Sequence, residues 1–286
     1  MNGTELENQS RGKRSGLVVF ILVLAFVLLG GAGFLFYWFH VGEPAKGYYE
    51  AAMQGDSEAQ YKLAECYYNG NGVRKDLSEA IKWYRKSAEQ GCAEGQCALA
   101  WHCEQGEGVS QDYTKAADLY KKAADQGFAK GQSGLGCCYF QGYGVDQDEV
   151  EAAKWFRKAA EQDFPEAQYN LGICYLGGKG VDEDKEEGFK WTHKAADQGL
   201  AEVQFRLGIC YELGIGVDED QEEGVKWIRK AADQGLAEAQ YALGLCYMTG
   251  EGVQKSGSEG IKWFKKAAKQ DHVEAQKILR RRGYTW

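Results

Sequence analysis

The chain has 286 residues, of which 38 are glycine and only two are proline, and its formal net charge is −8. This acidic balance argues against a nucleic-acid-binding protein, because a phosphate track needs a basic surface. Abundant glycine can indicate low complexity, but most of these glycines recur at fixed positions, which is typical of turns in a repeated structure.

An uncharged apolar segment, residues 16–39, follows a short basic stretch that contains Arg11, Lys13 and Arg14. As a helix this segment would be about 36 Å long, enough to cross a hydrocarbon core of about 30 Å. We therefore expect a single transmembrane helix at 16–39 and a cytoplasmic tail at 1–15, because basic residues stay on the cytoplasmic side. The repeats would then be extracytoplasmic, in a periplasm, a lumen or the cell exterior. The alternative, a cleaved signal peptide, usually has an apolar part of only about 7–15 residues.

A motif then recurs every 36 residues, and a glutamine followed three residues later by a leucine marks each copy. A fixed period in this range indicates a solenoid or array, and such arrays mainly offer extended binding surfaces. A linker and half repeat at 40–56 precede the full repeats, and a half repeat with a cap at 273–286 follows them. Repeats one to six are residues 57–92, 93–128, 129–164, 165–200, 201–236 and 237–272.

Each repeat predicts two amphipathic helices. In repeat one, apolar residues fall at helical spacing over 57–68 and again over 77–90. A Gly-x-Gly-Val turn at 70–73 lies between them, and its glycines can adopt the positive φ that ends a helix. The second helix starts with Asp76 followed by Glu79, which predicts a capping box. Each repeat is therefore expected to be an αα-hairpin.

The repeated pattern resembles a known family. A-E-A-Q-Y-x-L-G-x-C-Y-x-x-G-x-G-V and D-x-x-E-A/G-x-K-W-x-x-K-A-A-x-Q-G, as around 238–252 and 148–162, are similar to the Sel-one-like (SLR) repeat, a relative of the tetratricopeptide repeat. The resemblance covers residues 45–283. It implies an all-α fold, a right-handed α-solenoid superhelix of antiparallel helix pairs. It also implies an adaptor for membrane complexes, protein quality control, bacterial signalling or host contact, and some cysteine-rich bacterial relatives have been linked to β-lactam binding.

Five of the nine cysteines share one column of the repeat. Neighbours in this column are one repeat apart, about 8–10 Å if helix pairs stack, which exceeds the limit of about 7 Å for a disulfide. We expect them to be small buried apolar residues. The column in which the cysteine-rich relatives carry a bridging cysteine holds alanine here, so their disulfide pattern is absent. The column comprises Cys66, Cys138, Cys174, Cys210 and Cys246.

The other four cysteines, Cys92, Cys97, Cys103 and Cys137, lie with His102 in the first three repeats. They leave a disulfide, a redox module or a thiolate-rich metal site open as alternatives. Their spacing matches no standard zinc signature, so we assign no metal and no cofactor.

Departures from the repeat pattern mark candidate partner-binding residues. Repeat two departs most, since Trp101 stands on its first helix, the helix expected to line the concave face, and aromatic residues are favoured interface anchors. Alternatively, Trp101 fills space where Leu119 replaces the usual tryptophan. The residue type also varies between repeats in two polar columns. Such variation is expected of a surface shaped for one partner, and equally of exposed residues that have no role. The two columns comprise Lys62, Asn170 and Arg206, and Asn69, Gln105 and Gln141.

The predicted function is a membrane-tethered scaffold or adaptor that binds a partner protein or peptide on the concave face. We expect no enzyme and no catalytic residues, because the repeats contain no Ser-x-x-Lys motif and the four histidines lie in unrelated columns. The alternatives are a hydrolase-like, β-lactam-binding relative and a redox or metal module that uses the early cysteines.

Overall fold

The structure, a computed structural model, describes residues 45–286, and its regular secondary structure over this range is entirely α-helical. The all-α prediction is therefore confirmed for these residues. The predicted tail at 1–15 and transmembrane helix at 16–39 lie outside the described residues. From Ala45 onward, no helix is both long and apolar enough to span a bilayer.

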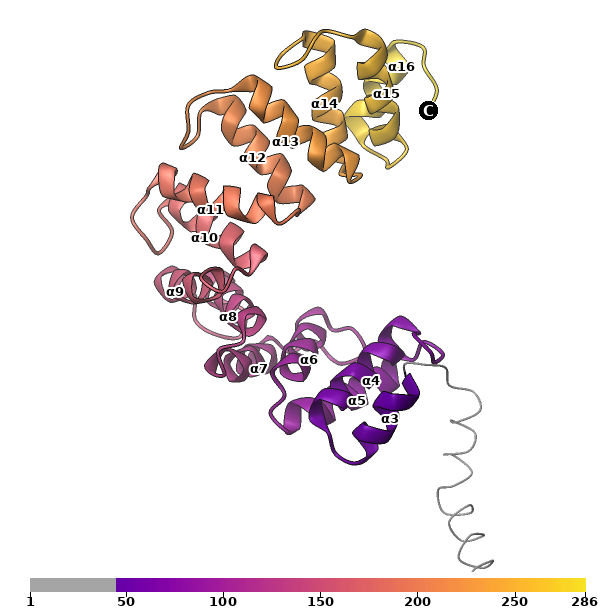
Figure 1. Cartoon of the computed structure of the whole chain (residues 1–286), viewed down its shortest axis with the longest axis vertical. Helices are drawn as coiled ribbons and strands as arrows, with labels where there is room; N and C mark the ends of the chain where they lie inside the picture. Colours follow the sequence, from indigo (N-terminus) through magenta and orange to yellow (C-terminus); the bar gives the residue numbers. More distant parts are fainter. Residues whose placement is uncertain (1–44) are drawn as a thin grey trace, which may run out of the picture. The chain divides into compact units, whose positions relative to one another are not determined.

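Fourteen helices follow one another in the described range, and from α4 onward they form the two-helix repeats (Figure 1). The two helices of one repeat pack against each other, as α10 packs on α11 and α12 on α13, and from repeat two onward each repeat packs on the next, as α7 packs on α8 and α13 on α14. The right-handed sense of the superhelix stays a prediction. The helices are α3 (Ala45–Met53), α4 (Ser57–Asn69), α5 (Leu77–Glu89), α6 (Ala93–Gln105), α7 (Tyr113–Asp125), α8 (Ala129–Gln141), α9 (Glu149–Ala160), α10 (Pro165–Gly177), α11 (Lys185–Asp197), α12 (Ala201–Leu213), α13 (Gln221–Asp233), α14 (Ala237–Thr249), α15 (Gly257–Ala268) and α16 (Val273–Arg281).

The described residues divide into two compact units between Gly95 and Gln96. The first unit contains α3, α4 and α5, and the second runs from α6 to Trp286. The second unit contains most of repeat two and all later repeats, so the candidate site below is argued within it.

Local signals start and stop the helices as the repeat pattern predicts. In repeat one, Gly70 has a φ of 80° and its N–H donates to the carbonyl of Cys66, which ends α4. The carboxylate of Asp76 accepts the backbone N–H of Glu79 at 3.0 Å and starts α5. The predicted capping box is only half formed, because the N–H of Asp76 donates to the Tyr67 carbonyl and the Glu79 carboxylate pairs with Lys82.

The glutamine column joins three helices in repeats one, four, five and six. Gln168 of α10 is buried, its side-chain amide donates to the Ala160 carbonyl of α9 at 3.3 Å, and its oxygen accepts from Gln198 at the end of α11 at 2.9 Å. Gln204 repeats the arrangement with Ala196 and Gln234. A buried amide must satisfy its donors and acceptors, which explains why this column stays polar.

In repeats three to six, the second glycine of the turn packs against the preceding repeat. A Cβ on Gly180, which has a φ of 70°, would lie 1.9 Å from the carbonyl oxygen of Glu149 at the start of α9. A Cβ on Gly144 would likewise lie 2.1 Å from the carbonyl oxygen of Tyr113. These columns hold glycine because both the positive φ and the close approach exclude a side chain.

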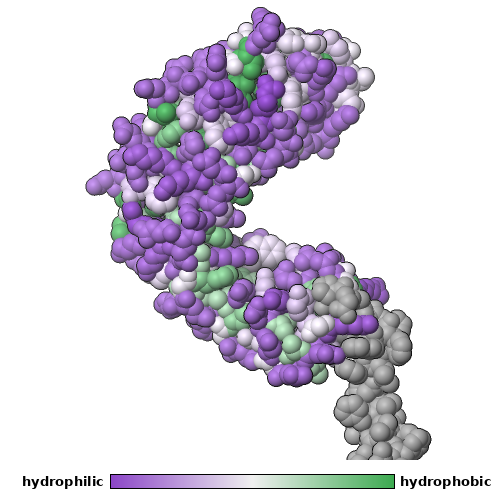
Figure 2. Space-filling view, in the orientation of Figure 1, coloured by the Kyte–Doolittle hydropathy of each residue, from purple (hydrophilic) through white to green (hydrophobic). Residues whose placement is uncertain are grey.

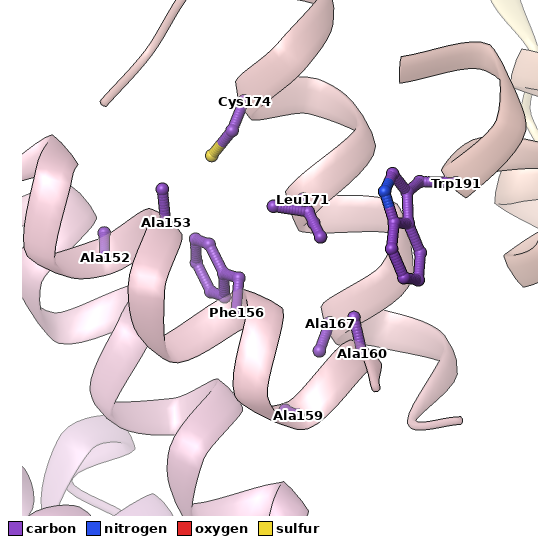
Figure 3. Close-up of a cluster of buried hydrophobic side chains, with 9 residues drawn as sticks. All are labelled: Ala152, Ala153, Phe156, Ala159, Ala160, Ala167, Leu171, Cys174 and Trp191. Atoms are coloured by element: carbon purple, nitrogen blue, oxygen red, sulfur yellow. The ribbon is translucent and has the colours of Figure 1, made fainter. Parts of the chain in front are cut away.

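The outer surface is mostly hydrophilic (Figure 2), and the apolar side chains gather between the helices. In one such cluster Phe156 of α9, Leu171 and Cys174 of α10 and Trp191 of α11 lie close together (Figure 3). Lys194, one of the basic residues near the ends of the second helices, lies over the Trp191 ring at 4.2 Å. The basic column thus covers the tryptophan column by cation–π contact as well as complementing the helix dipole.

Candidate functional site

A cavity of about 260 Å³ opens where the first helices of repeats two, three and four come together. Its walls are largely apolar, with one carboxylate and two side-chain amides among them. The lining residues are Glu104 of α6, Cys137, Cys138, Phe140 and Gln141 of α8, Tyr143 in the turn that follows, Phe156 of α9, and Asn170 and Ile173 of α10.

Close helix contacts position these side chains. Gly136 of α8 has no side chain, and a Cβ there would lie 2.6 Å from the Phe156 ring. The ring can therefore lie against α8 and contribute to the pocket wall as well as to the core. The Asn170 amide lies 3.7 Å from the Cys137 sulfur, so α8 and α10 are direct neighbours here. Tyr143 is exposed and stacks on Tyr113 at 4.7 Å.

The carboxylate of Glu104 is the one acidic group that lines the cavity. It accepts the hydroxyl of Tyr120 at 3.1 Å. Burial, together with the charge of Glu104, raises the pKa of Tyr120, so the hydroxyl stays protonated and keeps donating. The carboxylate therefore remains an anchored acceptor beside apolar walls.

The two cysteines of the pocket are poor nucleophiles. Desolvation by surrounding atoms raises the pKa of Cys138 to about 12. It also raises the pKa of Cys137 to about 11, although that residue is partly open to solvent. Because the thiolate is the reactive and metal-binding form, both side chains act as neutral walls near pH 7. The pocket therefore suits binding rather than covalent chemistry.

Two of the seven sequence-predicted residues come together in this pocket. Gln141 and Asn170, from different columns and different repeats, both line it. Trp101 is 39% exposed and packs edge-on against His102 on α6, and Gln105 is exposed one turn further along the same helix. Neither of them lines the cavity.

The other three predicted residues lie elsewhere. Arg206 is exposed on α12 and does not line the cavity. Lys62 and Asn69 belong to the first unit, where Lys62 pairs with Glu58 at 2.6 Å and Asn69 donates to Glu65 at 3.3 Å. Within their own helix these two are already engaged.

An apolar column on the first helices was missed by the sequence reasoning, except for Trp101. It lies two residues after the buried leucine column, where an amphipathic helix should be polar. Leu245 in this column is 38% exposed, and Leu213 beside it on α12 is 66% exposed. On the face drawn in Figure 2, some hydrophobic side chains reach an otherwise hydrophilic surface. The column comprises Trp101, Cys137, Ile173, Ile209 and Leu245.

The remaining cysteine chemistry gives no second site. Cys66, Cys174, Cys210 and Cys246 are buried, as predicted, and carry unbridged thiols. Burial raises the pKa of Cys174 to about 11 and that of Cys246 to about 12. Across residues 45–286, no three His, Cys, Asp or Glu side chains are grouped so that they could hold a metal ion.

The pattern and the geometry agree with a known family. The family model of the Sel1 repeat matches residues 57–92, 93–128, 129–164, 165–200, 201–236 and 237–272. The chain belongs to the Sel1 repeat family. The resemblance seen in the sequence is thus confirmed, and Sel1 repeat proteins generally mediate protein–protein interactions.

Solved structures place this Sel1 repeat chain among bacterial relatives. A protective antigen present in uropathogenic Escherichia coli strains, displaying an SLR fold, is 36% identical with a TM-score of 0.72, over 84% of this chain and 52% of that one. A Sel1 repeat protein from Oxalobacter formigenes is 33% identical with a TM-score of 0.73, over 82% and 68% of the two chains. The chain thus spans about half the length of the antigen.

A more distant match shows the fold alone. The immunity protein Pa5087 from Pseudomonas aeruginosa is 23% identical, with a TM-score of 0.53, over 75% of this chain and 82% of that one. No curated protein sequence matches the chain.

Proposed function

We propose that this Sel1 repeat protein is a scaffold that binds a segment of a partner protein. The segment binds on the solvent-facing side of the first helices, centred on the pocket that repeats two, three and four line. Residues 16–39 tether it to a membrane, with the repeats on the extracytoplasmic side. The observation that carries the binding proposal is the convergence of Gln141 and Asn170 on one largely apolar cavity.

The size of the cavity favours a side chain over a free small molecule. Ligand pockets usually measure about 300–1,000 Å³, whereas this one measures about 260 Å³. One large apolar side chain of a partner can enter between Phe140 and Ile173. The two amides each offer a donor and an acceptor, so they can pair with the backbone of the segment that carries this side chain.

The surface beyond the pocket extends the same binding mode. Interfaces concentrate binding energy in a few buried anchors that are surrounded by weaker contacts. The pocket provides the anchor site, and Ile209, Leu213 and Leu245 provide apolar surface further along the second unit. The resemblance, which puts the first helices on the concave face of a superhelix, supports the same choice of surface.

Site-specific photocrosslinking in native membranes tests the binding face. A crosslinker at Gln141 should capture a protein that the same crosslinker at Lys190, exposed on the second helix of repeat four, does not. Ile173→Asp should abolish this capture and reduce the affinity of the purified partner more than tenfold, because it puts a charge in the anchor pocket. Identical products from both positions, or capture that survives Ile173→Asp, would rule out this face.

Membrane fractionation tests the tether separately. The full chain should stay in the pellet after alkaline extraction, and deletion of 16–39 should release it. Protease added to spheroplasts, or to sealed vesicles whose extracytoplasmic side faces outward, should digest the repeats. Full release of the intact chain by alkali contradicts the anchor, and protection of the repeats contradicts the orientation.

A further inference from the structure

The C-terminal end of the chain has the opposite charge to the rest. Residues 262–286 contain eight basic and two acidic side chains, a formal charge of +6, whereas the other 261 residues together carry −14. This contrast is sharp for a repeat whose other copies mix both signs. It indicates a surface with a partner of its own.

A helix-terminating motif folds the tail back onto this basic end. Gly283 has a φ of 73°, its N–H donates to the carbonyl of Arg280 at 3.1 Å, and the Tyr284 N–H donates to that of Leu279 at 3.0 Å. These two bonds form the Schellman motif that ends α16. The tail thereby places Tyr284 beside Lys265 of α15, 5.6 Å away, and Trp286 beside Arg280, 5.4 Å away.

The arginines on this end keep their charge available. Lys262 and Lys277 form ion pairs with Glu259 and Glu274. No carboxylate of the described residues lies within ion-pair distance of Arg280, Arg281 or Arg282, as the ion pairs of residues 45–286 all involve other cations.

Large aromatic side chains are exposed next to these charges. Tyr284 is 44% exposed and Trp286 is 37% exposed. A terminal repeat needs a polar outer face for solubility, but either sign of charge would serve, and exposed aromatic rings work against solubility. Solubility of the terminal repeat therefore explains neither the single sign of charge nor the exposed rings.

Clustered cations beside tryptophan and tyrosine are typical of a protein surface that binds a lipid bilayer. Basic clusters attract anionic headgroups, and the rings of tryptophan and tyrosine prefer the headgroup level. Arginine binds phosphate with two parallel hydrogen bonds. An acidic protein would use the charges but has less need of two exposed rings. A single-stranded nucleic acid could stack its bases on the rings, but it needs a longer basic track than the end of an otherwise acidic chain offers.

We propose that the C-terminal patch, formed by Lys265, Arg280, Arg281, Arg282, Tyr284 and Trp286, binds the surface of an anionic phospholipid bilayer. The arginines bind the headgroup phosphates, and the two rings enter the headgroup layer. The acidic remainder of the chain is repelled by the same surface, so contact is confined to this end.

Vesicle binding by the full chain tests the patch. The chain is held in nanodiscs of phosphatidylcholine, which accommodate the predicted anchor, and is passed over immobilised vesicles with or without phosphatidylglycerol. We expect binding only to the anionic vesicles, with an affinity that falls as salt is raised.

Charge-matched variants identify the residues responsible. Replacing all three arginines with glutamine (R280Q, R281Q, R282Q) should weaken binding about 100-fold, given the usual contribution of one basic residue near an anionic surface. The matched control K154Q, K190Q, K226Q removes three charges from the second helices and should change the affinity little. Tyr284→Ala with Trp286→Ala should weaken binding about tenfold.

Several results would overturn the proposal. They are equal binding to neutral vesicles, an equal loss in the lysine control, or stronger binding to single-stranded DNA or polyglutamate than to anionic vesicles. Since α16 could unfold in the glutamine variant, the triple Arg→Lys variant keeps the charge and should retain most of the binding. The helical circular dichroism signal of each variant then distinguishes loss of the binding surface from unfolding.

Discussion

Repeats two and three, compared with repeats five and six, show how one framework supports two different surfaces. The same column holds Glu104 in repeat two and Glu212 in repeat five. Glu104 accepts the hydroxyl of Tyr120 at 3.1 Å and lines the pocket. Among residues 45–286, the carboxylate of Glu212 accepts a hydrogen bond from the thiol of Cys246 alone, at 3.7 Å, and desolvation raises the pKa of Glu212. The neighbours supplied by the adjacent helices, rather than the residue type, decide what each carboxylate does.

The shared framework should give the largest effect when it is broken. Gly180→Ala puts a Cβ 1.9 Å from the Glu149 carbonyl at a φ of 70°, so we expect the free energy of unfolding to fall by about 3 kcal/mol or more. The matched control is Gly199→Ala, where φ is 97° but nothing lies within 4 Å. It should cost about 1–2 kcal/mol. Denaturant unfolding measures both, and equal losses would mean that the turn does not press on the preceding repeat.

The buried glutamine column should give the next largest effect. Gln168→Leu removes two hydrogen bonds, one to the Ala160 carbonyl and one from the Gln198 amide. Each of these groups keeps one other partner, the N–H or the carbonyl of Asp163, so we expect a loss of about 2 kcal/mol, roughly 1 kcal/mol for each lost hydrogen bond. Lys190→Leu, an exposed helix position, is the control and should be close to neutral. If Gln168→Leu proves neutral or stabilising in denaturant unfolding, the column is not a structural joint.

The hydrogen bond between Tyr120 and Glu104 should matter less. Tyr120→Phe should cost about 1–2 kcal/mol, because it removes the hydroxyl donor to Glu104. Phe156 occupies the same column in repeat three and is buried, so the ring itself should fit. A double-mutant cycle with Glu104→Ala, which removes the acceptor, measures the coupling, and strictly additive effects would show that the bond does not stabilise the pocket wall.

The smallest effect should distinguish the two glutamates by pH. The pKa of Glu212 is raised in the folded state, so the folded protein holds this proton at a higher pH than the unfolded chain does. Its ionisation therefore destabilises the fold at neutral pH, and the effect fades as the pH falls toward the unfolded value of about 4.3. Glu212→Gln should raise the melting temperature by less than about 3 °C at pH 7, and by less at acid pH.

Glu104→Gln is the matched control for that measurement. Its amide oxygen can still accept the Tyr120 hydroxyl, but a neutral amide accepts more weakly than a carboxylate, so the melting temperature should not rise. Melting temperatures measured across pH that rise equally in both variants would contradict the proposed difference between the two carboxylates.

The helices themselves were predictable because their signals are local. Sequence placed the helices of repeat one at 57–68 and 77–90, and the structure has them at Ser57–Asn69 and Leu77–Glu89. Caps and turn glycines act within about four residues along the chain. The other half of the capping box failed because the cap N–H of Asp76 found the Tyr67 carbonyl on the neighbouring helix, a partner that local spacing does not reveal.

The candidate site was predictable only in part. Variation along two columns drew attention to Gln141 and Asn170, which the structure brings together in one pocket. It could not show that Glu104 and Ile173 complete the lining, since the first is 37 residues from Gln141 and the second occupies an apolar column. Trp101, the most conspicuous departure in the sequence, lies outside the pocket.

The sequence by itself determined the 36-residue period, the pair of helices in each repeat and the residues that start and stop them, because helical spacing, capping and positive φ depend on neighbours in the chain. Only the tertiary structure decided which exposed side chains share a cavity, which carboxylate gains a hydroxyl partner, and how Tyr284 and Trp286 return to the basic end. Those features depend on contacts between helices whose residues are tens of positions apart, and a repeated pattern specifies such contacts only after the repeats have packed.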